Sequence, residues 1–415
     1  MADKNEVSLL LVGTGGYGRV YLNELTAARE DGDAAGHHMP YRIAGAVEIA
    51  PAARAEAAER GIPLFDSLDD FYASNRADLA IISTPIYLHC GQILQCLASG
   101  SNVLCEKPLC ATVEEARQIE RAEKGSGLFV CVGYQMSFSR AIGELKSDAA
   151  GGLFGLPVLL KAIVHYPRNE AYYARNNWAG RIFTADGRPV NDSPLHNAVA
   201  HHFNNMLYIV GDAPDKAAFP VSVQAELYRG NPDIENFDTA ALRCRVTTGL
   251  GKGGADILFY TTHCLARAES FGPVCQYRFE RATVAHIDER EHETFYAMFD
   301  DGRTKQYTPC DAGQTQKLWD CIEAARGGPR PPSGVRAAIP EVIFANAAQI
   351  SHPVTQIPEA SVRRAGEPGT RYTDIEGLEK TLLKCFEQNL LPSELEDGER
   401  PAWASAGKIV DITEF

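Results

Sequence analysis

The sequence lacks the features that would assign it to a membrane, secreted or nucleic-acid-binding class. None of its apolar runs approaches the roughly 20 residues that a helix needs to cross a bilayer. Its first residues, Met1 to Glu6, contain no basic region followed by an apolar one, so we expect no secretory signal. Positive charge is scarce, because 40 lysines and arginines face 54 acidic residues. The resulting net charge of −14 argues against a nucleic-acid partner, and we expect no membrane partner either.

The cysteines lack any arrangement typical of disulfide frameworks or metal sites. There are 11 of them, an odd number, and no CxxC pair occurs. Most lie in apolar segments, where cysteine behaves as a small hydrophobic residue. The pattern fits a reducing cytoplasm, and we expect no bound metal. The 45% hydrophobic and 23% charged content is ordinary for a globular protein, and 415 residues suit two domains.

A glycine-rich turn near the N-terminus is the most informative feature that the sequence does contain. It follows an apolar run from Ser8 to Val12, which predicts a buried strand, and a helical segment comes after it. Gly13 would allow the tight turn, Gly15 the approach of a pyrophosphate, and Gly18 close packing of the helix. The alternative is a purely structural turn. The predicted dinucleotide-binding residues of this turn are Gly13, Thr14, Gly15, Gly16, Tyr17 and Gly18.

An acidic residue ends the second predicted strand, which runs from Arg42 to Glu48. A carboxylate at this position can accept hydrogen bonds from the ribose hydroxyls of adenosine, and it repels the 2′-phosphate of NADP. Ile49 and Ala50, which follow, offer no cation to that phosphate. We therefore expect Glu48 to favour NAD over NADP. A solvated acid at a strand end is the alternative.

Two further predicted strands, Asp78 to Ser83 and Asn102 to Cys105, alternate with helices, which predicts a parallel, doubly wound sheet. Ligands of such sheets bind beyond the carboxyl ends of the strands. Pro108 restricts Lys107 to an extended backbone, and a lysine held in a cleft can stabilise a developing alkoxide. A surface cation is the alternative. The other candidate cofactor-binding residues at these strand ends are Thr84, Pro85, His89 and Glu106.

Taken in order, these motifs resemble the Gfo/Idh/MocA family of NAD(P)-dependent sugar and polyol oxidoreductases. The set consists of GxGxxG, the strand-end acid, Thr-Pro-x-x-x-His at 84–89 and Glu-Lys-Pro at 106–108, and the similarity runs from about residue 8 to about residue 350. The resemblance implies a Rossmann domain followed by an α+β domain with a large, mostly antiparallel, open-faced sheet. We place the NAD-binding domain at 1–134 and the substrate-binding and oligomerisation domain at 135–415. The resemblance further implies a substrate held between the domains, and a homo-dimer or homo-tetramer formed through the sheet.

The second half of the chain contains a helical stretch that bears candidate catalytic residues. Ser193 can cap this helix and Gly211 suits its end, with Asn197, His201, Asn204 and Tyr208 opposite the apolar face. The family has a histidine ten residues before such a glycine, which the resemblance places at His201. Asn197 and Asn204 stand where the family has aspartates, and Asp192 is a nearby acid that could replace them. A solvated polar face is the alternative reading.

A segment just before this helix, residues 172–181, combines aromatic, cationic and amide side chains. Such a mixture suits a polyhydroxylated ring, although a structural loop would explain it equally well. The candidate substrate-binding residues are Lys107, Tyr134, His165, Tyr173, Arg175, Asn177, Trp178, Asn197 and His201.

The leading hypothesis is an NAD-dependent oxidoreductase that oxidises a secondary alcohol of a sugar, sugar derivative or cyclitol. In this hypothesis His201 is the general base, Lys107 stabilises charge on the substrate oxygen, and Asn197 holds a substrate hydroxyl or the His201 ring. One alternative is a redox-neutral, NAD-dependent enzyme that cleaves glycosides. Another is an NAD-binding sensor without catalytic activity.

Overall fold

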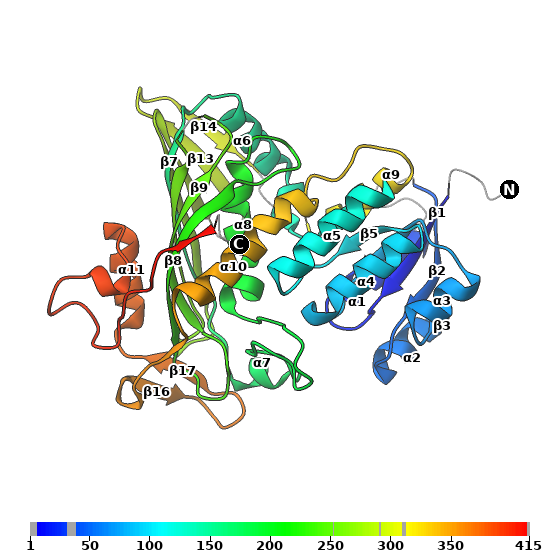
Figure 1. The fold of residues 1–415 in the computed structure, drawn as a ribbon, viewed down its shortest axis with the longest axis horizontal. Helices are drawn as coiled ribbons and strands as arrows, with labels where there is room; N and C mark the ends of the chain where they lie inside the picture. The colour runs from blue at the N-terminus through cyan, green and yellow to red at the C-terminus, as the bar shows by residue number, and fades with distance from the viewer. Residues whose placement is uncertain (1–5, 31–38, 252, 290–291, 309–312, 413–415) are drawn as a thin grey trace. The chain divides into compact units, whose positions relative to one another are not determined.

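The structure is a computed structural model that describes residues 6–30, 39–251, 253–289, 292–308 and 313–412. The chain forms two compact units (Figure 1). The first comprises residues 1–138 and 312–339, and the second residues 139–311 and 340–415. The predicted second domain included residues 312–339, which instead pack with the first unit. In the described ranges, no helix is both long enough and apolar enough to cross a membrane.

The first unit is built on a six-stranded sheet in which every neighbouring pair is parallel. In spatial order the strands are β3 (Leu64–Phe65), β2 (Tyr41–Val47), β1 (Val7–Val12), β4 (Leu79–Ile82), β5 (Asn102–Cys105) and β6 (Val130–Val132). The helices of this part are α1 (Gly18–Glu30), α2 (Pro51–Glu59), α3 (Leu68–Ser74), α4 (Ile86–Ala98), α5 (Val113–Ser126) and α9 (Gln316–Ala325), with a 3₁₀ turn, η1 (Gln135–Phe138). The predicted doubly wound parallel sheet is confirmed.

The apolar sequence of β1 explains its central position, because every residue from Val7 to Val12 is buried. A strand covered by helices on both faces requires such an unbroken apolar run. α9 adds to the same core through Leu318, Trp319 and Ile322, none of them more than 2% exposed. Residues distant in sequence therefore complete the core of the first unit.

The second unit is built on a large sheet with order β14-β13-β12-β11-β7-β10-β9-β8-β15, in which most neighbours are antiparallel. Its strands are β7 (Pro157–His165), β8 (Phe219–Arg229), β9 (Thr239–Thr247), β10 (Ala255–Thr262), β11 (Phe271–Phe279), β12 (Ala282–Glu289), β13 (His292–Phe299), β14 (Thr304–Tyr307), β15 (Thr355–Gln356) and β18 (Val410–Asp411), which pairs with β8. The predicted mostly antiparallel sheet is confirmed.

Helices and a small hairpin complete the second unit. The helical elements are α6 (Arg140–Ala150), α7 (Glu170–Ala174), η2 (Pro194–Ala198), α8 (Ala200–Ile209), α10 (Val335–Ser351, which begins in the first unit), η3 (Glu359–Ser361), α11 (Leu378–Gln388) and η4 (Pro392–Glu394). β16 (Val362–Ala365) and β17 (Tyr372–Ile375) form the hairpin.

The two faces of the large sheet pack against different helices. The alternation of side chains along β7 shows which helix covers each face. Lys161 Nζ donates to the carbonyl of Phe386 in α11 at 2.7 Å. Tyr166, just past the strand and of opposite parity, instead forms a hydrogen bond with His202 of α8 at 2.8 Å. Successive residues of a strand point to opposite faces, so α8 and α11 cover opposite sides of the sheet.

The predicted helix from Ser193 to Gly211 is interrupted. Ser193 Oγ accepts a hydrogen bond from the His196 N–H at 3.2 Å, as expected of an N-cap. Residues Pro194–Ala198 then form one π-helical turn, and α8 begins at Ala200. The alternative reading of a solvated polar face is wrong for Asn204 and Tyr208, because they are only 1% and 2% exposed. A wider π turn shifts the angular position of every residue after it.

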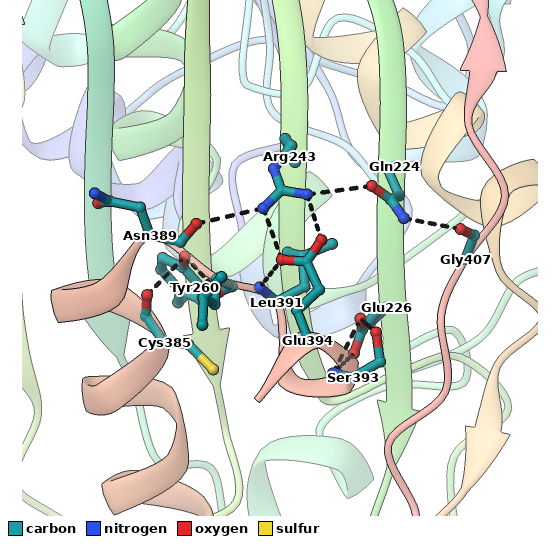
Figure 2. Close-up of polar contacts among 11 residues, drawn as sticks. Gln224, Glu226, Arg243, Tyr260, Cys385, Asn389, Leu391, Ser393, Glu394 and Gly407 are labelled. Atoms are coloured by element: carbon teal, nitrogen blue, oxygen red, sulfur yellow. Dashed lines mark hydrogen bonds and ion pairs between the residues drawn. The ribbon is translucent and has the colours of Figure 1, made fainter. Parts of the chain in front are cut away.

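The C-terminal segment from α11 onward lies across the α11 face of the sheet (Figure 2). Arg243 of β9 forms two hydrogen bonds with Glu394, at 2.6 and 2.7 Å. Tyr260 of β10 donates to the Leu390 carbonyl at 2.8 Å. Apolar residues of the same segment pack beneath these contacts: Leu382, Phe386, Leu391, Leu395 and Trp403. This segment therefore covers part of the face through which we expected subunits to pair, and the dimer or tetramer stays a prediction.

Two glutamates at this contact have pKa values shifted in opposite directions. Glu226 of β8 is fully buried and accepts hydrogen bonds from Tyr228 Oη at 2.6 Å and from the Ser393 N–H at 3.1 Å. Burial raises the pKa of Glu226 despite these donors. The guanidinium of Arg243, in contrast, lowers the pKa of Glu394.

The opposite pKa shifts predict opposite pH dependence of stability. A raised carboxyl pKa contributes stability at low pH that is lost as the pH rises, whereas a lowered one contributes stability that is lost as the pH falls. We therefore expect Glu226→Gln to gain stability relative to the wild type as the pH rises from about 4 to about 7.5, and Glu394→Gln to lose stability relative to the wild type as the pH rises from about 2.5 to about 5. Urea unfolding midpoints of the three proteins at these four pH values test this. Shifts of the same sign in both variants would contradict it.

Candidate functional site

The turn after β1 excludes side chains at two of its glycines. Gly13 has a φ of +84°, and a Cβ there would lie 3.0 Å from the Ser83 carbonyl oxygen. A Cβ on Gly18, the first residue of α1, would lie 2.2 Å from the Gly13 carbonyl oxygen. Only glycine permits this close passage of the turn and the start of α1. At the start of α1, the N–H groups of Gly18 and Val20 donate to the carbonyls of Gly15 and Tyr17, both at 2.9 Å, which closes the turn onto the helix.

Glu48, directly after β2, places its carboxylate in this turn. Its Oε2 accepts hydrogen bonds from the N–H groups of Thr14 at 2.7 Å and Gly15 at 3.1 Å. Its Oε1 accepts from the N–H groups of Ile49 and Ala50, both at 2.8 Å. Burial alone would raise the pKa of Glu48, but these four donors hold it below its ordinary value. The carboxylate is therefore ionised near neutral pH.

His89 connects the ends of β4 and β5. It is 1% exposed, with Nδ1 at 2.8 Å from the Pro108 carbonyl and Nε2 at 2.9 Å from the Thr84 carbonyl. Burial lowers the pKa of His89, and the two carbonyls act in the opposite direction. Both ring nitrogens contact the backbone, so His89 supports the turn that contains Lys107. Pro85 is the N-cap residue of α4.

A buried ion pair lies beneath the Glu106-Lys107-Pro108 turn. Lys317 Nζ of α9 lies 2.6 Å from Glu106 Oε1, 3.2 Å from Tyr17 Oη and 3.3 Å from the Gly133 carbonyl oxygen. Tyr21 Oη donates to the same Glu106 oxygen at 2.5 Å. A Cβ on Gly133 would lie 2.8 Å from Glu106, so glycine makes room for the carboxylate. One ammonium thus connects the glycine turn, the end of β5 and the end of β6.

The charge of Lys317 is maintained by its partners. Burial on its own would lower the pKa of Lys317, which is 1% exposed, but Glu106 and Tyr17 hold it above the ordinary value. We did not identify this lysine from the sequence. The available signal was its position four residues before Cys321, on the apolar face of a helix.

In the second unit, Asp192 holds the amide of Asn197. Asn197 Nδ2 donates to Asp192 Oδ1 at 2.6 Å, and the Gly180 N–H donates to Asp192 Oδ2 at 2.7 Å. Asp192 is 3% exposed. The acid that we considered as a replacement for the missing aspartates is thus the direct partner of the candidate catalytic amide.

Histidines near the start of α8 lie in different surroundings. His201 is partly buried. His202 Nε2 lies 2.8 Å from Tyr166 Oη, and burial lowers the pKa of His202 to about 4. His196 is buried and contacts Glu341 Oε1 at 3.0 Å. His202 and His196 are therefore fixed by protein partners that the sequence did not reveal.

Several candidate substrate residues gather in a second aromatic and polar group of this unit. Tyr173 Oη lies 2.9 Å from His263 Nδ1. The guanidinium carbon of Arg175 lies 3.6 Å from the ring centre of Tyr172 and 5.5 Å from that of Trp178. Asn177, in the same segment, is exposed.

Three candidate residues do not join this group. His165 is fully buried on the α11 face, with Nδ1 at 3.7 Å from Glu379 Oε1, whereas Tyr166 faces α8. Tyr134 and Lys107 belong to the first unit, where Tyr134 is 1% exposed and Lys107 partly buried. The structure thus places His165 away from Asn197 and His201, on the opposite face of the sheet.

The described residues form no group of three or more histidine, cysteine, aspartate or glutamate side chains suited to a metal ion. Ten cysteines lie in the described ranges, and all ten are free and buried. Cys310 lies outside those ranges.

Comparison with known proteins identifies the first unit. Residues 7–134 match the model of an oxidoreductase family, GFO_IDH_MocA, described as an NAD-binding Rossmann fold. The predicted NAD-binding Rossmann fold is thereby confirmed.

Two curated relatives match part of the chain. An inositol 2-dehydrogenase of Rubrobacter xylanophilus is 29% identical over 166 residues, which are 38% of this chain and 44% of the relative. The rhizopine catabolism protein MocA of Rhizobium meliloti is 26% identical over 225 residues, 54% of this chain and 64% of the relative. The chain thus matches less than two thirds of the length of each.

Solved structures share the fold over most of the chain. The WlbA dehydrogenase of Bordetella pertussis, in complex with NADH and UDP-GlcNAcA, has a TM-score of 0.66 at 21% identity, covering 84% of this chain and 97% of that one. The UDP-N-acetylglucosamine 3-dehydrogenase GnnA of Acidithiobacillus ferrooxidans has a TM-score of 0.62 at 17% identity, covering 83% and 97%. Both units of the chain therefore have counterparts in known dehydrogenase structures.

Removing Lys317 tests the buried pair. We expect Lys317→Met to lower the free energy of unfolding by about 3–5 kcal/mol, because Glu106 would be left as a buried charge without its cation. A second change, Glu106→Gln, should recover much of this loss in the double variant. Because the pKa of Lys317 is raised, the wild-type contribution should persist through neutral pH and disappear only in strongly alkaline solution. Urea unfolding measures each effect, and additive losses would show that the two residues are not coupled.

Proposed function

Because residues 7–134 match the GFO_IDH_MocA oxidoreductase family, we propose that the chain is an NAD-dependent dehydrogenase that oxidises a secondary alcohol of a sugar, sugar derivative or cyclitol. The observation that carries the proposal is the glycine turn after β1 at the carboxyl edge of the parallel sheet, with Glu48 at the end of the adjacent β2 and the Glu106-Lys107-Pro108 turn at the end of β5, two strands away on the other side. That edge is where doubly wound sheets bind dinucleotides.

The residues around the turn fit a dinucleotide. Gly13 and Gly18 leave no room for a Cβ, so the chain turns tightly into α1. Ser83 Oγ, at the end of β4, is buried with no hydrogen-bond partner among the described residues, and it adjoins Gly18. NAD, when bound, supplies the hydride acceptor, and Gly13 to Gly18 would hold its pyrophosphate.

NAD is favoured over NADP by the charge at the end of β2. Glu48 is ionised near neutral pH, so its charge would repel a 2′-phosphate, and ribose hydroxyls would share its oxygens with the four backbone N–H groups that already donate to them. The nearby Arg54 forms an ion pair with Asp66 at 2.8 Å and donates to the Glu48 carbonyl, so it is already occupied. This local charge balance supports NAD.

The proposed chemistry divides among three residues. His201 takes the proton of the substrate hydroxyl as the C–H bond breaks, and Lys107 stabilises negative charge on the same oxygen. Asn197, fixed by Asp192, orients a substrate hydroxyl or the His201 ring. The support of Lys107 by His89 and Glu106 favours a fixed position for its backbone.

The role of Lys107 can be separated from cofactor binding. We expect Lys107→Met to lower kcat by about 10²-fold or more, because positioned electrostatic stabilisation of a developing charge is lost. The dissociation constant for NADH, measured by fluorescence titration, should change little. Full turnover in this variant would remove Lys107 from the mechanism.

The role of Glu48 can be tested with both cofactors. We expect Glu48→Gln to bind NADPH about tenfold or more tightly than the wild type does, because the repulsion of the 2′-phosphate is removed. Binding of NADH should weaken severalfold as the charged acceptor is lost. An unchanged ratio of the two dissociation constants would contradict this assignment.

A further inference from the structure

Arg168 lies just past the end of β7 and is held against aromatic rings. Its backbone N–H donates to the His263 carbonyl at 3.0 Å. Its guanidinium carbon lies 4.7 Å from the ring centre of Tyr172 and 5.7 Å from that of Tyr166. Such contacts stabilise a cation through the ring faces while leaving the edge of the guanidinium plane available for hydrogen bonds.

No carboxylate or carbonyl of the described residues accepts a hydrogen bond from this guanidinium, and Arg168 Nε is buried without a partner. A buried donor left without an acceptor is costly in a folded protein. Arginine also cannot lose its proton to avoid that cost. An acceptor supplied from outside the chain would satisfy this group.

The other arginines of the same region each lie against a protein oxygen. Arg371 Nε, which like Arg168 Nε forms no hydrogen bond, still lies 3.1 Å from Glu170 Oε1 in an ion pair, and Arg364 donates to Thr373 Oγ1 at 3.0 Å. Arg175 donates to the Tyr172 carbonyl at 2.5 Å. Arg168 differs from them because, among the described residues, it has neither a carboxylate at ion-pair distance nor a hydrogen-bond acceptor.

The carboxylates near these rings bind groups other than Arg168. Burial and the charge of Asp192 raise the pKa of the Tyr172 hydroxyl, and the two Asp192 oxygens accept hydrogen bonds from Asn197 and Gly180. Burial and the charge of Asp238 raise the pKa of Tyr173, and Asp238 accepts hydrogen bonds from the N–H groups of Gly230 and Asn231. His263 is buried, and burial together with Arg168 keeps its pKa well below the ordinary value, so it carries no charge at neutral pH.

Arg168 belongs to the same polar region as the candidate substrate residues. Tyr166, which contacts its guanidinium, forms a hydrogen bond with His202, the neighbour of His201. Tyr172 packs edge-on against Tyr173, with ring centres 5.2 Å apart. A group bound at Arg168 would therefore lie beside residues proposed to hold the carbohydrate.

We propose that the substrate carries a carboxylate and that Arg168 binds it. The inference rests on the proposed dehydrogenase function and narrows its substrate class to sugar acids, such as uronates and aldonates. A guanidinium and a carboxylate form two parallel charged hydrogen bonds, a geometry that a lone hydroxyl cannot reproduce. A phosphate dianion would call for a second unpaired cation, and the neighbouring Arg175 is already engaged with Tyr172.

The test compares acids with their neutral counterparts. NADH formation is measured with D-glucuronate, D-galacturonate and D-gluconate, and with D-glucose, D-galactose and D-glucose 6-phosphate. We expect a higher kcat/KM for at least one acid than for the neutral sugars. Arg168→Met should lower the ratio of acid to neutral kcat/KM by about 10- to 100-fold, the range expected for a lost charged hydrogen bond. Arg168→Lys should fall between the two, because it keeps the charge without the paired geometry.

A matched control is available in the same part of the chain. Arg188 is exposed and pairs with Asp186 at 2.7 Å, so Arg188→Met removes a positive charge without removing the unpaired guanidinium. We expect this variant to keep the wild-type preference for acids. A loss equal to that of Arg168→Met would indicate a general charge effect and overturn the proposal.

Binding measured without turnover separates this inference from the proposed function. The thermal unfolding midpoint is recorded with NADH and each sugar or acid. If acids raise the midpoint of the wild type but not of Arg168→Met, while no compound reduces NAD, the carboxylate site stands and the dehydrogenase proposal fails. If neutral sugars or the phosphate react better than the acids, the dehydrogenase stands and the carboxylate site fails. If nothing binds or reacts, both fail.

Discussion

The ion pair between Lys317 and Glu106 is the contact on which the first unit's strand ends depend. Both groups are buried, and taking two charges out of water is costly unless each finds the other together with further hydrogen bonds. Tyr17, Tyr21 and the Gly133 carbonyl supply those bonds. The glycine turn, the Lys107 turn and the end of β6 are thereby fixed by one cation of α9, which lies 300, 211 and 184 residues further along the chain than its contacts Tyr17, Glu106 and Gly133.

The position of that cation explains what the sequence could predict about the first unit and what it could not. The strands, the glycine turn and Glu48 were predictable because each depends on local patterns: unbroken apolar runs, glycines at fixed spacing and an acid at a strand end. Lys317 depends on residues 312–339 returning to the first unit. No local pattern encodes that return, because it follows from core packing of Leu318, Trp319 and Ile322.

The second unit shows a different limit of prediction from the sequence. The strand periodicity predicted most of the sheet, but the face to which each residue points depends on parity, and a difference of one residue reverses it. His165 and Tyr166 are both polar, aromatic and next to each other at the end of β7. The sequence alone therefore could not show that Tyr166 faces α8 while His165 lies against α11. The π turn at Pro194–Ala198 had a similar effect on the helix, because 3.6-residue spacing no longer relates residues on its two sides.

The hydrogen bond between Asp192 and Asn197 suggests how an asparagine can function at a position where the family has an aspartate. A carboxylate only accepts hydrogen bonds, so the 2.6 Å contact with Asp192 Oδ1 fixes Nδ2 of Asn197 as the donor and turns its Oδ1 the other way. A hydrogen bond from the amide to a carboxylate also polarises the amide, which makes its oxygen a stronger acceptor. The second unit therefore presents an oriented acceptor whose strength derives from a buried acid five residues earlier. Such an acceptor can orient an imidazole N–H or a substrate hydroxyl, while the negative charge itself stays on Asp192, one hydrogen bond behind the amide.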